Sequence, residues 1–203
     1  MYPKPIKEFI DKFAKLPGIG PRQAARLAFW LLNGPKETRQ NLKRVLEGLD
    51  KDARTCGLCH YVIENDGNDK CHFCDNPSRD HKTICVVEKE TDLATIERSG
   101  TYKGLYHVLG GLFSALDTAV PKHLKLPELI NRIENRKKET EEVILALSPT
   151  HEGDLTAHYL ERLLKPSKVK ITRLGRGLPY GSDVEFADAQ TLSGALESRK
   201  EIK

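Results

Sequence analysis

The chain has 203 residues, of which 31% are charged and 38% hydrophobic, and its formal net charge is +4. This length allows one substantial domain with smaller modules, and no apolar run is long enough to cross a bilayer. Residues 1–5 do not have the composition of a signal peptide, so we expect a cytoplasmic protein.

The positive charge is concentrated in the first quarter of the chain. Residues 1–54 hold twelve Lys and Arg against six Asp and Glu, whereas the remainder is slightly acidic. This asymmetry indicates a polyanionic partner, although surplus lysines on a solvated helix face would give the same pattern. Two apolar stripes at helical spacing are expected to face a core. They are Ile6, Phe9, Ile10 and Phe13, and then Leu42, Val45, Leu46 and Leu49.

A glycine-rich turn lies between the two stripes. Residues 16–27 read LPGIGPRQAARL, so Gly18 and Gly20 lead directly into a helix. The free N–H groups at the start of such a helix bind phosphate, and Arg22 and Arg26 lie four residues apart, where they would flank it. The stretch resembles the helix-hairpin-helix motif of proteins that bind DNA independently of its base sequence. A plain helical hairpin is the alternative.

Two Cys-x-x-Cys pairs follow, separated by eleven residues. Two such pairs supply the four thiolates of a closed tetrahedral zinc site, which holds structure because no coordination position stays open for chemistry. The alternatives are two disulfides or a redox dithiol, and His60 or His72 could replace one thiol. The predicted ligands are Cys56, Cys59, Cys71 and Cys74. The fifth cysteine, Cys85, lies in an apolar run and is expected to be a buried strand thiol.

From residue 83 onward, short β-rich runs alternate with helical patterns. Strands are predicted at Thr83–Val87, Leu105–Leu109, Val143–Leu147 and Val169–Leu174. Helices are predicted at Glu90–Ser99, Leu126–Lys138 and Leu155–Leu164. This alternation predicts a largely parallel sheet with right-handed crossovers and helices covering it.

Acidic residues follow two of these strands. Glu88 comes directly after the first strand, and Glu152 and Asp154 follow the third. Because ligands gather at the carboxyl ends of parallel strands, the three carboxylates are expected to converge and would suit magnesium. The alternative is that two of them lie at a helix N-terminus, where acids are commonplace. The tail adds a glycine-rich loop at 173–181 that is not a Walker A motif, and then a helix that packs on the chain or on a neighbouring subunit.

Taken together, these segments resemble the RecR family of bacterial recombination mediators along nearly the whole chain. Residues 16–26 resemble its helix-hairpin-helix, the four cysteines its zinc finger, and residues 86–88 with 152–154 its Toprim domain. Residues 107–111, and 176–183 with 185–188, resemble two further family segments, the latter a Walker-B-like tail. The chain departs from the family at Ser148, at His151 and at residues 118–120, which affects local loop geometry.

The resemblance implies a multidomain α/β protein. It implies a helix-hairpin-helix region at 1–54, a zinc finger at 55–79, a Toprim domain at 80–172, and a C-terminal loop and helix for assembly at 173–203.

The resemblance also implies a DNA-repair protein without enzymatic activity. It would form a ring, typically a tetramer, that encircles DNA and acts with RecO and RecF to load RecA at single-strand gaps and junctions. Gly18, Gly20, Arg22 and Arg26 would contact DNA, and Glu88, Glu152 and Asp154 would contribute to the partner surface. One alternative is a magnesium-dependent Toprim nuclease or primase that uses these carboxylates. Another is an interaction scaffold whose N-terminal charge is incidental.

Overall fold

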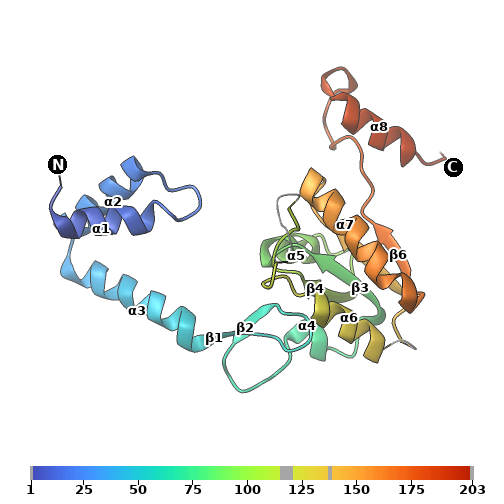
Figure 1. Ribbon diagram of the computed structural model, residues 1–203, viewed down its shortest axis with the longest axis horizontal. Coiled ribbons are helices and arrows are strands. Elements are labelled where there is room, and N and C mark those ends of the chain that lie inside the picture. The colour runs from blue at the N-terminus through green and yellow to red at the C-terminus, as the bar shows by residue number, and fades with distance from the viewer. Residues whose placement is uncertain (1, 115–120, 137–138, 202–203) are drawn as a thin grey trace. The chain divides into compact units, whose positions relative to one another are not determined.

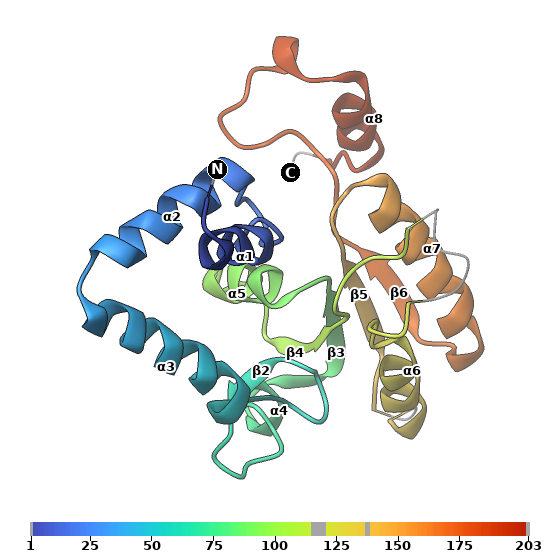
Figure 2. The same cartoon turned by 60° about the vertical axis from the view of Figure 1, so that its left-hand side comes forward.

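The computed structural model describes residues 2–114, 121–136 and 139–201, which include most of every predicted element. The chain divides into two compact units, Met1–Arg54 and Thr55–Lys203. Figure 1 shows the helical first unit and the mixed α/β second unit, and Figure 2 shows the same chain turned by 60°. The predicted departure from the family at residues 118–120 lies outside the described residues.

The first unit consists of three helices: α1 (Lys4–Phe13), α2 (Pro21–Asn33) and α3 (Lys36–Asp52). Helices α1 and α2 pack against each other, and Ala24 and Ala28 are the buried residues of α2. Small side chains at these two positions allow a close helical approach. Phe9 and Phe13 stack with ring centroids 3.9 Å apart on α1.

The first unit does not bury both apolar stripes. The α1 stripe is half-buried, but Val45 and Leu49 on α3 are each 62% exposed, so the predicted core role of the second stripe is wrong for the isolated chain. A hollow of about 410 Å³ lies among Ile6, Phe9 and residues of α3. Three helices of this length enclose little volume, and one stripe therefore stays in solvent.

The second unit begins with a small two-stranded sheet. Strand β1 (Ala53–Thr55) crosses the boundary between the units and pairs with β2 (Val62–Glu64). The short helix α4 (His72–Asp75) follows. The two cysteine pairs lie in this segment, whose strands are separate from the main sheet.

A four-stranded sheet forms the centre of the second unit. Its order is β4-β3-β5-β6, and every neighbouring pair is parallel, as the alternating sequence pattern predicts. Val87 at the end of β3 lies opposite Val108 on one side and Ala146 on the other. The strands are β3 (Asp80–Val87), β4 (Gly104–Val108), β5 (Glu142–Ala146) and β6 (Lys170–Arg173).

Alternate residues of the sheet face two different apolar cores. Ile84 and Val86 pack with residues of α6 (Leu126–Asn135) and α7 (His151–Leu164). Cys85 and Val87 pack instead with α5 (Glu90–Arg98) and with the cysteine pairs. Figure 2 shows α5 on one side of the sheet and α6 and α7 on the other. This two-sided burial explains why the parallel strands read as continuous apolar runs.

Helix α7 begins four residues earlier than the sequence pattern predicts. Thr150 caps it, because its side chain accepts a hydrogen bond from the Gly153 N–H over 3.1 Å. Residues 151–154 therefore belong to the first helical turn and not to the preceding loop. Helix α5 agrees with its prediction within one residue, and α6 ends at Asn135, with residues 137–138 outside the described part. The 3₁₀ turn Lys165–Ser167 lies between α7 and β6, and the tail contains the 3₁₀ turn Val184–Phe186 and helix α8 (Ala189–Glu197).

Candidate nucleic-acid interface and metal centre

The turn between α1 and α2 presents the start of α2 to solvent. Gly18 has φ +75°, a left-handed conformation that favours glycine, and the Ile19 N–H donates to the Leu16 carbonyl over 3.1 Å. Gly20 has an ordinary extended backbone and caps α2. No described atom lies within 4 Å of where its Cβ would be, so internal packing does not require glycine there. A missing side chain at this point leaves the helix start open to a ligand.

Arg22 and Arg26 lie one turn apart at the beginning of α2 and are both exposed. Within the described ranges, neither guanidinium has an ion pair or a side-chain hydrogen bond. Some other charges of this unit are paired locally, such as Lys4 with Glu8 and Lys43 with Glu47. The two arginines and the α2 N-terminus therefore form a positive surface suited to phosphate.

The four paired cysteines meet in the second unit. Their Sγ atoms all lie within 4.8 Å of one another, and all four side chains are buried. Each pair makes a tight turn: the His60 N–H donates to the Cys56 carbonyl over 3.0 Å, and the Asp75 N–H to the Cys71 carbonyl over 3.0 Å. Backbone N–H groups also point at sulfur, with Cys71 N 3.3 Å from Cys56 Sγ. Such N–H···S contacts favour thiolate.

This donor set fits zinc. Four buried sulfurs that converge on one point are the ligand set of structural zinc sites, and no disulfide joins them in the structure. All five cysteines are free thiols in the structure. Neither His60 nor His72 belongs to the cluster, which removes the alternative of a histidine ligand in this arrangement. When bound, zinc would hold the two turns together and leave no position for substrate.

The cysteine cluster is part of the second core of the main sheet. The Val108 N–H of β4 donates to the Cys59 carbonyl over 2.8 Å. Arg132 of α6, which is 6% exposed, donates from one terminal nitrogen to the carbonyls of Leu58 (3.1 Å) and Tyr106 (2.6 Å). Its other terminal nitrogen lies 3.8 Å from Cys74 Sγ. Arg132 therefore brings a buried positive charge to a cluster that would be anionic with zinc.

His107 lies on β4 beneath the first cysteine turn and is fully buried. Its Nε2 lies 2.9 Å from the Lys125 carbonyl, so that nitrogen carries the proton, and Nδ1 has no partner among the described residues. The His60 ring is 5.3 Å away, edge to face. Burial, reinforced by the nearby Arg132 charge, lowers the pKa of His107 to about 3. The imidazole is therefore neutral at neutral pH.

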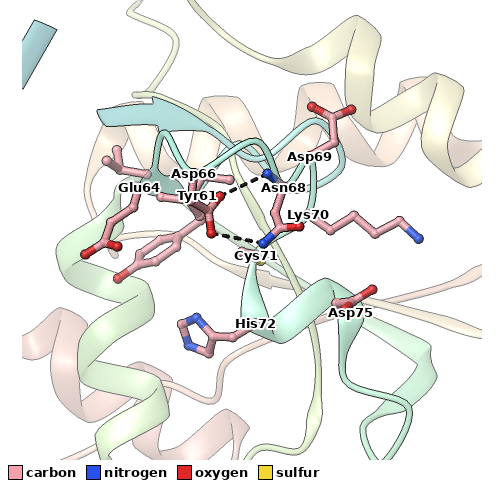
Figure 3. A pocket seen from close by; sticks show the side chains of 11 residues that line it. Tyr61, Glu64, Asp66, Asn68, Asp69, Lys70, Cys71, His72 and Asp75 are labelled. Atoms are coloured by element: carbon pink, nitrogen blue, oxygen red, sulfur yellow. Dashed lines mark hydrogen bonds between the residues drawn. The ribbon is translucent and has the colours of Figure 1, made fainter. Parts of the chain in front are cut away.

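A hollow of about 710 Å³ lies on the outer side of the second cysteine pair (Figure 3). Tyr61 and His72 line it together with a lysine and several acids. Asp66 at its rim accepts hydrogen bonds from the backbone N–H and the side-chain amide of Asn68, each over 2.9 Å. Its acidic side chains are Glu64, Asp66, Asp69 and Asp75. The surplus of carboxylates makes this surface unfavourable for a polyanion, in contrast with the start of α2.

The three predicted Toprim carboxylates lie around the carboxyl end of the sheet but do not form one ligand cluster. Among the described residues, three or more possible metal-ligating atoms come within 4.8 Å of one another only at the four cysteines. Glu88 accepts a hydrogen bond from Ser148 over 3.0 Å and lies 3.5 Å from Lys89. Glu152 and Asp154 lie in the first turn of α7, as the helix-terminus alternative predicted. The predicted convergence is thus not realised in this arrangement.

Two arginines hold Asp154. Arg173, at the end of β6, lies 2.6 Å from its Oδ1, and Arg176, in the following loop, donates to the same oxygen. Partial burial opposes ionisation, but the two guanidinium groups hold the pKa of Asp154 below its ordinary value. The sequence shows these arginines in a glycine-rich loop, but nothing local indicates their partner. Nothing local in the sequence indicates that Arg132 lies beside the sulfur of Cys74 either.

Cys85 confirms the prediction of a buried strand thiol. It is 2% exposed on β3, and burial raises its pKa to about 12. It lies in the same core as the four paired cysteines but outside their cluster. Its role is packing.

Three family models match consecutive parts of the chain. "RecR, helix-hairpin-helix" matches residues 6–49, "Toprim domain" matches 82–175, and "RecR, C-terminal" matches 177–200. The curated relative "Recombination protein RecR" of Bifidobacterium animalis subsp. lactis (strain AD011) is 45% identical over 201 residues, which cover 99% of this chain and 98% of the relative. Within the residues that the structure describes, no helix is long and apolar enough to span a bilayer.

Proposed function

The chain belongs to the RecR family of recombination proteins, and on that premise we propose that it is a DNA-repair mediator that binds DNA through the start of α2. We assign residues 1–54 to DNA binding, 55–79 to the zinc finger, 80–172 to the Toprim domain and 173–203 to assembly. The observation that carries the proposal is the pair of unpartnered arginines beside an open, glycine-lined helix start.

Phosphate groups are the proposed ligands of this surface. The backbone of Gly18 and Gly20 leaves room for a phosphate to reach the α2 N–H groups, and Arg22 and Arg26 supply the charge. Contacts of this kind carry no sequence information, so binding is expected to ignore sequence and to weaken steeply with salt. Single-strand gaps and junctions are the proposed targets.

Zinc is the proposed structural cofactor, with Cys56, Cys59, Cys71 and Cys74 as its ligands. The buried sulfur cluster supports this assignment. A site of four thiols that stay reduced also suits the cytoplasm, which we propose as the location of the protein. Replacement of Cys56 by Ser should release zinc and destabilise the second unit, and a folded variant that contains no zinc would contradict a structural role.

We propose that the Toprim carboxylates bind a protein partner and perform no catalysis. The pairing of Asp154 with Arg173 and Arg176 supports this, because guanidinium groups already neutralise the carboxylate that a catalytic magnesium would need. RecO and RecF are the proposed partners, and promotion of RecA loading is the proposed outcome. If wild-type protein cleaved DNA or synthesised primers with magnesium, and Glu88→Ala abolished that activity, the Toprim enzyme would replace this reading.

Assembly into a ring, proposed as a tetramer, would cover apolar surface that the single chain exposes. Val45 and Leu49 of α3 are largely in solvent, as are Tyr180 and Phe186 of the tail. Contacts between subunits would remove these large apolar side chains from water. Native mass spectrometry should show four subunits with one zinc each, and a zinc-bound monomer at every concentration would contradict the ring.

The decisive experiment compares DNA binding at several salt concentrations. Arg22→Ala/Arg26→Ala should weaken binding to a gapped duplex and reduce the slope of log affinity against log salt by about two, one for each phosphate contact. Lys4→Ala/Lys43→Ala is the matched control, because it removes the same charge from the same unit at lysines paired with glutamates. Equal losses in the two double variants would show that only net charge matters and would refute the assigned surface.

A further inference from the structure

Trp30 lies on α2 with most of its indole in solvent. Its side chain is 64% exposed, and it is the single tryptophan of the 203-residue sequence. Among the residues that the structure describes, the indole has neither a hydrogen-bond partner nor an aromatic neighbour. A lone exposed apolar side chain is ordinary on a protein surface, so any role of Trp30 depends on the residues beside it.

The residues beside Trp30 belong to the proposed DNA-binding surface. Arg22, Arg26 and Trp30 follow one another at four-residue steps, which places them along one side of α2. Trp30 and Arg26 also line a shared hollow of about 440 Å³, together with Gln23 and Leu27. Along one side of a single helix, this surface thus combines an aromatic face, a positive charge, an amide and an apolar side chain.

We propose that Trp30 is a stacking platform for an unpaired nucleobase of single-stranded DNA. The proposal rests on the proposed DNA-binding function and extends it from phosphate to base. Proteins that bind single strands combine a positive track for the backbone with aromatic side chains on which bases stack, and every base offers a π face. Charge complementarity favours this occupant, because Arg22 and Arg26 would bind phosphates of the DNA backbone along the same side of the helix.

The platform would distinguish single-stranded from double-stranded DNA. In a duplex, each base is already stacked between its neighbours, so its face is not accessible to Trp30 without local opening. In a single strand the faces are free. Arg22 and Arg26 would bind either form through phosphate, and Trp30 would add affinity only for the unpaired one.

The single tryptophan makes the test direct, because fluorescence excited at wavelengths that the six tyrosines do not absorb reports Trp30 alone. The full-length protein is titrated with a thymine oligonucleotide and with an abasic oligonucleotide of equal length, which carries the same phosphates. Stacking predicts that the thymine strand quenches the fluorescence and that the abasic strand and a blunt duplex leave it nearly unchanged.

Affinities of variants measured by anisotropy complete the test. Trp30→Ala should bind the thymine strand roughly 5- to 150-fold more weakly, the range that corresponds to loss of one base stack, while its affinity for the abasic strand and its salt slope stay unchanged. Trp30→Phe should retain most of the affinity. Leu32→Ala is the control, because Leu32 is 58% exposed on the opposite side of the same helix.

The outcomes separate this inference from the function on which it rests. Absence of all DNA binding would overturn both. Equal binding of the thymine and abasic strands, lost in Arg22→Ala/Arg26→Ala but not in Trp30→Ala, would overturn the platform and leave the phosphate surface intact. Fluorescence that changes with protein concentration and not with DNA would show that a second copy covers the indole, which would also overturn the platform.

Discussion

Acidification should destabilise the second unit through His107. Burial and the Arg132 charge lower the pKa of this imidazole to about 3, whereas the pKa of a histidine in an unfolded chain is about 6.5. The unfolded state therefore binds a proton that the native state does not. Stability contributed by neutral His107 is fully present above pH of about 6.5 and is lost progressively as the pH falls toward about 3. Each pH unit in this window costs about 1.4 kcal/mol, so a change from about pH 7.5 to about pH 5 costs about 2 kcal/mol.

The assay is urea unfolding of wild type and His107→Gln at both pH values. Contributions shared by the two proteins, including protonation of the cysteine ligands, cancel in the difference between their unfolding free energies. On acidification, the unfolding free energy of wild type should fall by about 2 kcal/mol more than that of His107→Gln. His158→Gln is the control, because His158 is 77% exposed and its pair with Glu161 is in solvent. The difference in unfolding free energy between this variant and wild type should change by less than about 0.5 kcal/mol between the two pH values. An unchanged difference for His107→Gln would refute the argument from burial.

Three further predictions concern other buried groups. Arg132→Met should release zinc to a chromogenic chelator roughly tenfold faster, whereas Arg136→Met, which removes an arginine paired with Glu139 just after the same helix, should not. Gly153→Ala should lower the unfolding free energy in urea by about 3 kcal/mol, because the new Cβ would clash with the Ser148 carbonyl oxygen, while Gly177→Ala has open space and should change it little. Cys85 should resist iodoacetamide in the native protein at pH of about 8, since its pKa is about 12, and rapid native labelling detected by mass spectrometry would contradict its burial.

The sequence indicates the elements better than their long-range partners. The strands and their parallel direction could be predicted because continuous apolar runs alternate with amphipathic helices. The zinc ligands could be proposed because a Cys-x-x-Cys turn is local. The stripe on α3 was misassigned because amphipathicity shows that a face is apolar and not what covers it. The start of α7 was missed because Thr150 caps a helix whose first turn is polar.

Side-chain pairs between distant segments leave no such local signal. Asp154 is bound by arginines that lie about twenty residues later in the chain, and Arg132 reaches a sulfur more than fifty residues earlier. Both pairs depend on which strands and helices become neighbours in the folded sheet. Conversely, the positions of Glu88, Glu152 and Asp154 after two parallel strands suggested a cluster that the three carboxylates do not form.

The packing of the cysteine turns against β4 has a consequence for biosynthesis. Because Cys56 to Cys74 are translated before Tyr106 and Val108, the nascent chain presents these thiols before the side chains that will cover them exist. Zinc capture at that stage would order the segment before the sheet can form, since the sheet must wait for β5 and β6. We therefore expect zinc supply during translation, more than after it, to set the yield of mature protein.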